Sequence, residues 1–301
     1  MDSKRPAPLS EGSRFFQRLQ RRYADTFASL PAGVPHQSLL MQAYQQLRAQ
    51  GHEVGPALRI LRQWTMARLL TMDCEQDAPL DLITTAVTHL AELALDEACQ
   101  QAFQDLDARH GAPLLANGEK AQLWVVGMGK LGARELNVSS DIDLIYVFDE
   151  DGETAGNAQG LGKISVHEYF SRAVKAIFTL VGDTTEHGFV FRMDLALRPN
   201  GESGHSVVSL DALEEYFQVQ GREWERFAWL KGHVLADSGI AGADARRRDE
   251  AALFEIVRPF VFRRYLDFRA FDAMRDLHAM IRAEVARRDA RGAGSTMPRP
   301  A

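Results

Sequence analysis

Two aspartates open an almost unbroken apolar segment in the middle of the chain. Asp141 and Asp143 begin the run DIDLIYVF, whose β-branched and aromatic residues are typical of a buried strand. Side chains at positions i and i+2 of a strand point to one face, so both carboxylates should project together while Ile142 points into the core. Neighbouring carboxylates repel each other unless a cation lies between them or one of them binds a proton. A hard divalent cation such as Mg²⁺ takes oxygen ligands of this kind.

A third acidic residue, Asp194, lies in an equally apolar setting. It falls within GFVFRMDLAL (188–197), which we expect to form another strand. An acid inside an apolar strand needs a partner. That partner is either the Asp pair with a metal or, in a purely structural interpretation, Arg192 or Arg198.

A glycine-rich connection precedes the Asp pair. The expected strand AQLWVVG (121–127) leads into GMGKLG (127–132), which has the G-x-G-x-x-G spacing of a dinucleotide-binding fold. That fold needs a complete helix before the next strand, and too few residues remain before Asp141 for a helix and a turn. We favour a turn whose backbone N–H groups and Lys130 face a phosphate. An ordinary tight turn and a dinucleotide-dependent oxidoreductase are the alternatives.

The connection is followed by an acidic stretch. Between positions 135 and 162 the chain has acidic residues but no Lys or Arg. We expect Asp149 and the acids at 150–153 to form a solvated loop.

Much of the remaining chain has helical periodicity. Apolar residues recur at threes and fours from Gly12 to about His110, which predicts a helical bundle. Further helices are expected over 165–181, where Ser165 and Glu168 form a capping box, and over 209–234, 249–267 and 271–289. On the helix 209–234, Arg222 and Arg226 would share one face, either as surface ion pairs with nearby glutamates or as phosphate ligands.

Composition excludes several classes of protein. The 301 residues include 35 basic and 41 acidic ones, a net charge of −6, which argues against a general nucleic-acid-binding protein. Two cysteines, Cys74 and Cys99, have neither zinc-site nor redox spacing, so we expect a reducing cytoplasm. No segment reads as a signal peptide or approaches the ~18 apolar residues of a membrane span.

Three stretches in this order resemble the glutamine synthetase adenylyltransferase family: GMGKLGARELNVSSDIDLIYVF, FRMDLALRPNGESG and YFQVQGREWERFAWLKGHVLA. The resemblance is to its N-terminal, adenylyl-removing half, and it is dense from about Gln122 to Asp289. It implies an α+β fold, a DNA polymerase β-like nucleotidyltransferase domain in which helices flank a mixed sheet. With the composition and periodicity of the chain, we expect a flexible N-terminus (1–11), a helical domain (12–115), the nucleotidyltransferase domain (116–240), C-terminal helices (241–289) and a disordered tail (290–301).

The resemblance also implies a reaction and a site. The reaction is phosphorolysis of AMP from a tyrosine of adenylylated glutamine synthetase, which yields ADP and serves the control of nitrogen assimilation, with the PII signal protein as regulator. The residues implied to be catalytic and to bind Mg²⁺ or Mn²⁺ are Asp141, Asp143 and Asp194. The residues implied to line the phosphate and nucleotide site are Gly127, Gly129, Lys130, Ser140 and Arg198.

Two departures from the family pattern support a second, non-enzymatic hypothesis. Ala196 stands where the pattern usually has an arginine, and ARGAGSTMPRPA (290–301) stands where family members continue with further helices and a second transferase domain. We therefore expect a truncated chain without the adenylylating activity. The alternative is a catalytically impaired fragment that acts at most as a binding module for glutamine synthetase or PII.

Overall fold

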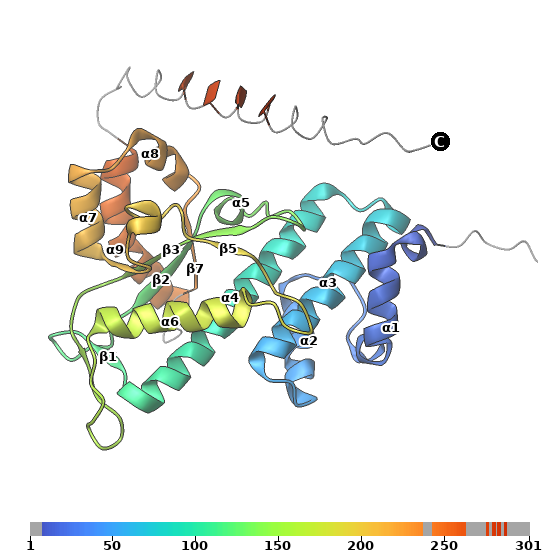
Figure 1. Ribbon diagram of the computed structural model, residues 1–301, viewed down its shortest axis with the longest axis horizontal. Helices are drawn as coiled ribbons and strands as arrows, with labels where there is room; N and C mark the ends of the chain where they lie inside the picture. The colour runs from blue at the N-terminus through green and yellow to red at the C-terminus, as the bar shows by residue number, and fades with distance from the viewer. Residues whose placement is uncertain are drawn as a thin grey trace, which may run out of the picture.

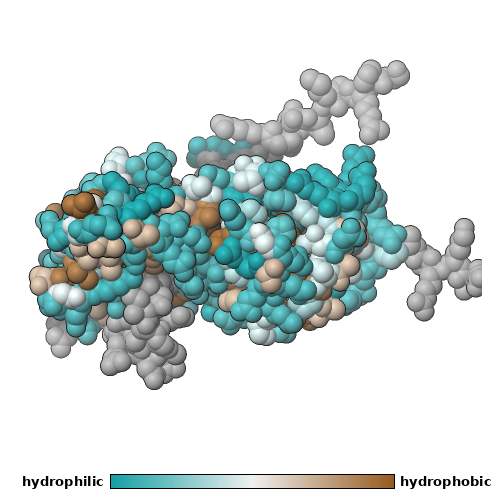
Figure 2. Space-filling model, turned by 90° about the horizontal axis from the view of Figure 1, so that it is seen from below, coloured by the Kyte–Doolittle hydropathy of each residue, from teal (hydrophilic) through white to brown (hydrophobic). Residues whose placement is uncertain are grey.

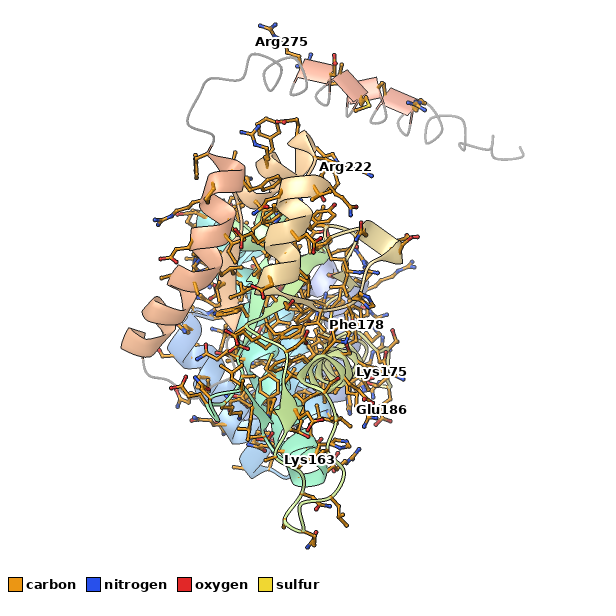
Figure 3. All side chains as sticks on the ribbon, turned by 90° about the vertical axis from the view of Figure 1, so that its left-hand side faces the viewer. Lys163, Lys175, Phe178, Glu186, Arg222 and Arg275 are labelled. Carbon is orange, nitrogen blue, oxygen red and sulfur yellow. The ribbon has the colours of Figure 1, made fainter. Side chains whose placement is uncertain are left out.

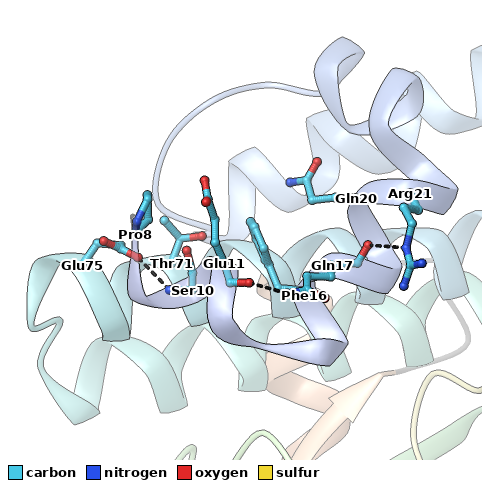
Figure 4. A pocket seen from close by; sticks show the side chains of 9 residues that line it. All are labelled: Pro8, Ser10, Glu11, Phe16, Gln17, Gln20, Arg21, Thr71 and Glu75. Atoms are coloured by element: carbon cyan, nitrogen blue, oxygen red, sulfur yellow. Dashed lines mark hydrogen bonds between the residues drawn. The ribbon is translucent and has the colours of Figure 1, made fainter. Parts of the chain in front are cut away.

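A computed structural model of the chain describes residues 8–236 and 243–262, with short helical pieces between 275 and 287 (Figure 1). Most of the expected helix 271–289 and the whole tail 290–301 lie outside the described residues. The structure describes the chain from residue 8 onward, and the expectation of a flexible N-terminus is wrong for residues 9–11, which belong to a 3-10 helix. This 3-10 helix, η1 (Leu9–Gly12), contacts helix α3 (Val54–Gln76) through a hydrogen bond of 2.9 Å from the Ser10 N–H to the Glu75 carboxylate (Figure 4).

The helical periodicity of the first third is confirmed. Its helices are α1 (Arg14–Ser29), α2 (Gln37–Ala49), α3 (Val54–Gln76) and α4 (Leu80–His110). Ser13 begins α1 because its side chain accepts a hydrogen bond from the Phe16 N–H. Gly111, at φ +72°, follows the last residue of α4, a conformation that favours glycine.

A mixed five-stranded sheet forms the second part of the molecule, as predicted. Its strands run in the order β5-β3-β2-β7, with β6 also paired to β3; they are β2 (Leu123–Gly127), β3 (Ile142–Phe148), β5 (Met193–Asp194), β6 (Val208–Ser209) and β7 (His233–Ala236). Strand β3 is antiparallel to β2 and parallel to β5 and β6. The antiparallel β2–β3 pair rules out the dinucleotide-fold alternative, because a dinucleotide fold joins parallel strands through a helix. A separate two-stranded sheet pairs β1 (Pro113–Leu114) with β4 (Glu153–Thr154).

Helices cover both faces of the large sheet (Figure 1). Along β3, Tyr146 and Phe148 belong to the apolar cluster that includes α4 and α6 (Val166–Val181). The alternating residues Ile145 and Val147 belong to a second cluster on the opposite face. That cluster is formed with α7 (Leu210–Val219), α8 (Glu223–Trp229) and α9 (Ala243–Val261). The period-two pattern of the sequence therefore fixes which helices each face contacts.

The predicted strand 188–197 is shorter than expected. The N–H groups of Val190 and Phe191 bind the carbonyl of Val181 at the end of α6, at 2.9 and 3.2 Å, instead of joining the sheet. Beyond Asp194 the chain turns, with the Arg198 N–H bonded to the Leu195 carbonyl at 3.1 Å. Of the predicted strand 188–197, only the two residues of β5 pair with β3.

The expected long helix 209–234 is also wrong, because the chain breaks at Gly221 between α7 and α8 and then enters β7. A Cβ on Gly221 would lie 2.5 Å from Phe260 of α9 and 2.9 Å from the Phe217 carbonyl. The close packing of α7 against α9 therefore requires glycine at position 221. Glycine also has a low helix propensity, which favours the break at this position. Figure 3 shows Arg222 at this α7–α8 end, away from Lys175 and Phe178 on α6.

None of the helices in the described part is long and apolar enough to cross a membrane. The face seen in Figure 2 is mostly hydrophilic, with hydrophobic residues gathered in scattered patches.

Candidate functional site

The parallel pairing of β3 with β5 brings Asp143 and Asp194 together. The register places Asp143 directly opposite Asp194, one position beyond the pair Ile142 and Met193. A backbone hydrogen bond of 2.9 Å from the Ile142 N–H to the Arg192 carbonyl fixes this register. Two carboxylates from distant parts of the sequence are thereby neighbours at one edge of the sheet.

Asp143 lies in an environment that disfavours its charge. The side chain is half-buried, and burial raises its pKa above the ordinary value. The negative charges of Asp194 and Asp141 raise the pKa further, and Lys130 opposes them by lowering it. The protein's own cations therefore do not fully compensate this carboxylate.

Asp141 precedes the first residue of β3 and forms an ion pair with Arg192. Arg192 also donates a hydrogen bond of 3.0 Å to the Ser139 carbonyl. Both side chains of the pair are about half exposed, so the pair contributes little to stability. The sequence predicted that Asp141 and Asp143 would project together and considered Arg192 as a partner for Asp194; in the structure Arg192 pairs with Asp141.

Asp194 accepts a hydrogen bond of 2.7 Å from the Ala196 N–H and is exposed. Arg198, its other suggested partner, donates instead to three carbonyls of its own loop, those of Leu195, Glu202 and Gly204, at 2.8 to 3.1 Å. Within the described residues Asp194 has no ion pair with either arginine, so the purely structural explanation for this acid finds no support.

The glycine-rich connection folds as a one-turn helix, α5 (Gly129–Gly132), against this carboxylate edge. Gly129 has φ +54°, and a Cβ there would lie 3.0 Å from the Asp143 Oδ2 atom. A Cβ on Gly132 would lie 1.9 Å from the Lys231 carbonyl, so the turn packs closely against the chain that enters β7. Gly129 and Gly132 therefore allow the backbone to lie close to Asp143 and to Lys231.

Lys130 and Ser140 lie at opposite ends of this connection and meet. The Lys130 Nζ atom donates to the Ser140 hydroxyl at 3.3 Å. Lys130 also acts on the charge of Asp143. Of the residues predicted for the phosphate site, Gly129 and Lys130 lie near Asp143, and Ser140 contacts Lys130. Gly127, in contrast, ends β2 and is buried in the sheet.

Arg222 and Arg226 do not share a helix face. Arg222 is the exposed residue that precedes α8, whereas Arg226 is buried and donates to the Phe260 and Val261 carbonyls at the end of α9. Their use together as phosphate ligands is therefore excluded.

The expectation that Asp149 lies in a solvated loop is wrong. Its carboxylate accepts the N–H groups of Gln122 and Glu150, each at 3.0 Å, and burial raises its pKa to about 6. The other three acids of this stretch, Glu150, Asp151 and Glu153, are exposed as expected.

Sequence reasoning missed how Arg192 holds the loop before β3. Its ion pair with Asp141 and its bond to the Ser139 carbonyl depend on the register of β5 against β3. The sequence did contain one indication of this role: Arg192 lies two residues before Asp194, which places it at the same edge of the sheet.

Comparisons with known proteins now define the class. The sequence profile of the glutamate-ammonia ligase adenylyltransferase family matches residues 13–248. The chain therefore belongs to the glutamate-ammonia ligase adenylyltransferase family, which is a family of nucleotidyltransferases.

Particular relatives carry the name bifunctional glutamine synthetase adenylyltransferase/adenylyl-removing enzyme. The relative from Aromatoleum aromaticum is 46% identical over 293 residues, covering 94% of this chain and 30% of the relative. That from Burkholderia pseudomallei is 45% identical over 271 residues, covering 88% and 29%. That from Ralstonia nicotianae is 50% identical over 233 residues, covering 77% and 24%. The chain thus spans at most about a third of the length of these relatives.

Proposed function

We propose that this chain is the adenylyl-removing half of such a bifunctional enzyme, with a DNA polymerase β-like nucleotidyltransferase fold. The observation that carries the proposal is Asp143 facing Asp194 across β3 and β5, beside the contact of Lys130 with Ser140. The mixed sheet between helical layers and the names of the relatives support it. In this proposal 12–115 is the helical domain and 116–240 the nucleotidyltransferase domain.

The donor set fits Mg²⁺ or Mn²⁺. No three His, Cys, Asp or Glu side chains in the described part lie close enough together to hold a metal by themselves. Mg²⁺, however, is usually held by one or two carboxylates together with substrate phosphates and water. Asp143 and Asp194 would supply these carboxylates, with Asp141 as a proposed third ligand. The raised pKa of Asp143 supports this assignment, because a bound cation would relieve the repulsion behind it.

The proposed reaction transfers AMP from a tyrosine of glutamine synthetase to phosphate. An oxygen of inorganic phosphate would attack the AMP phosphorus, and the bond from that phosphorus to the tyrosine oxygen would break. The phosphate's proton would pass to the tyrosine oxygen, so the products are ADP and free tyrosine. A bound cation would supply positive charge for the oxygens around the reacting phosphorus.

This chain's own residues would hold the substrates in place. Lys130 and Ser140 would orient phosphate oxygens, and Gly129 would let the backbone approach them. Gly127 would fix the start of this connection at the end of β2. Arg198 would line the phosphate and nucleotide site from the loop whose carbonyl groups it binds.

The proposed setting is the control of nitrogen assimilation in the cytoplasm. Adenylylated glutamine synthetase would be the protein substrate, and the PII signal protein would be the regulator. No nucleic-acid or membrane partner is proposed.

The test is a phosphorolysis assay with adenylylated glutamine synthetase, Mg²⁺ and inorganic phosphate, in which ADP is followed over time. We expect ADP release that requires phosphate and is lost in Asp143→Asn. Asp25→Asn, which changes an exposed carboxylate on α1, is the matched control and should release ADP like the unmodified chain.

The ion pair of Asp141 with Arg192 favours the second candidate, an inactive binding module, because it occupies one proposed metal ligand. In that case no ADP would be released by any variant, while the chain would still co-elute with glutamine synthetase or PII. That result would contradict the proposed reaction.

A further inference from the structure

A cavity of about 640 Å³ lies on the helical side of the loop that leads into Asp141. Side chains from α1, α3, α4 and the loop 137–139 line it. We call it the Arg62 pocket, after the basic residue that lines it together with the apolar side chains of Phe15, Met66, Leu69, Ile83 and Val138. Its walls are mostly apolar, so a ligand that fills it needs an apolar body.

Arg62 has no partner of opposite charge in the described part of the chain. Its Nε atom is fully buried and has no hydrogen-bond partner. The guanidinium lies over the ring of Phe189, 5.1 Å from the ring centroid. Asp73 also lines the pocket, but it lies eleven residues further along α3, about 16 Å at the helical rise per residue.

The other two arginines of α3 are paired with backbone carbonyls. Arg59 donates to the carbonyls of Thr179, Asp183 and Gly188 at 2.7 to 3.2 Å. Arg68 donates to the Gly33 carbonyl at 2.8 and 3.3 Å. Arg62, which faces the pocket, therefore differs from its neighbours in lacking such acceptors.

An uncompensated cation in an apolar cavity is unfavourable. Burial lowers the pKa of Arg62, and the nearby positive charge of Arg192 lowers it further. An anion bound at the part of the guanidinium that lines the pocket would supply the missing opposite charge.

We propose that the Arg62 pocket binds a small organic anion, a carboxylate with an apolar body. The carboxylate meets the Arg62 guanidinium, and the body packs against Met66, Leu69, Ile83 and Val138. Inorganic phosphate matches the charge but leaves the apolar walls uncovered. This inference goes beyond the proposed reaction and does not depend on it.

The pocket and the carboxylate edge share one loop. Ser139 lines the pocket, and its carbonyl accepts the hydrogen bond from Arg192, which pairs with Asp141. Asp143 and Asp194 do not line the pocket, so binding in it can be tested separately from the candidate active site.

The probes are 2-naphthoate and its neutral counterpart 2-naphthol, titrated by calorimetry at pH 7. We expect one naphthoate site with an affinity at least about tenfold above that of naphthol, the gain typical of a charge-assisted hydrogen bond. Arg62→Met should lower naphthoate affinity to the naphthol level, and Arg62→Lys should retain part of the difference. Leu80→Asn, at a pocket residue that is 73% exposed, should weaken both probes.

Two controls keep the test specific. Arg68→Met removes a different arginine of the same helix, and Asp143→Asn changes the candidate active site; both should bind naphthoate as the unmodified chain does. Unchanged naphthoate affinity in a folded Arg62→Met variant would overturn the proposal. If that variant fails to fold, the proposal is overturned when Arg62→Lys keeps the full preference for naphthoate over naphthol and Leu80→Asn binds both probes as the unmodified chain does. Displacement of naphthoate by equimolar inorganic phosphate would overturn it as well, because phosphate has no apolar body.

Discussion

At the scale of single residues, the site is a set of charges that the protein leaves partly uncompensated. Asp143 faces Asp194 and lies near Asp141, and Lys130 is the cation that opposes them. The sequence indicated all three aspartates and Lys130, because each stands in or beside an apolar strand. The sequence could not assign Arg192 to Asp141, because that pairing depends on the register between two strands.

Asp143→Asn should stabilise the chain at pH 7 in the absence of divalent metal. The raised pKa means that ionised Asp143 is disfavoured in the folded state, and asparagine removes the charge at constant shape. We expect a gain of roughly 0.5–1 kcal/mol in unfolding free energy, since solvent partly screens this half-exposed group. Thermal denaturation monitored by circular dichroism measures it, with Asp25→Asn as control.

The pH dependence of this gain follows from the direction of the shift. A raised pKa contributes stability below the ordinary pKa of aspartate and loses it as the pH rises through the raised value. The stability difference between Asp143→Asn and the unmodified chain should therefore shrink toward low pH. A difference that grows on acidification contradicts the charge argument.

Asp149 should titrate at about pH 6 in the folded chain, against an ordinary value of 3.8, because its carboxylate is largely removed from water. Its contribution to stability is present below pH 3.8 and is lost as the pH rises to about 6. A carbon-13 NMR titration of the carboxyl groups measures this midpoint. A midpoint near 4 would mean that the acid is solvated after all.

At the scale of helices and strands, the sequence predicted those elements whose formation depends on residues close together in the chain. The strands β2 and β3 and the helices α1 to α4 and α6 follow from apolar periodicity, and Ser165 caps α6 by accepting the Glu168 N–H at 3.1 Å as expected. The break between α7 and α8 could not be predicted, because it depends on Phe260, which lies far along the chain. The short β5 has the same origin, since the α6 terminus binds the residues that precede it.

Gly221→Ala tests the account of that break. The new Cβ would collide with Phe260 and with the Phe217 carbonyl, so α7 and α9 would have to separate. We expect a loss of about 2 kcal/mol in unfolding free energy, typical of overpacking. Urea denaturation measures the loss.

Gly12→Ala is the control for this experiment, since a Cβ there meets nothing within 4 Å. It should leave stability within about 0.5 kcal/mol of the unmodified chain. Equal stability of the two variants would show that contact with Phe260 does not require glycine at 221.

At the scale of the whole molecule, one apolar cluster runs from the N-terminal helices into the sheet, and a second covers the opposite face. Arg59 of α3 adds a polar link, because it holds the connection between α6 and β5. The helical part therefore supports the segment that delivers Arg192 and Asp194 to the site. Sequence patterns predicted most of the helices and the strands β2 and β3, and the family resemblance implied a mixed sheet. Neither could show that β5 is parallel to β3, and this pairing creates the site.

The central claim is that the carboxylates facing each other across β3 and β5 bind a divalent cation. Calorimetric titration with Mn²⁺ of the unmodified chain, Asp143→Asn, Asp194→Asn and the control Asp25→Asn tests it directly. We expect one Mn²⁺ site that is lost in both site variants and retained in the control. Equal Mn²⁺ affinity in Asp143→Asn and the unmodified chain would contradict it.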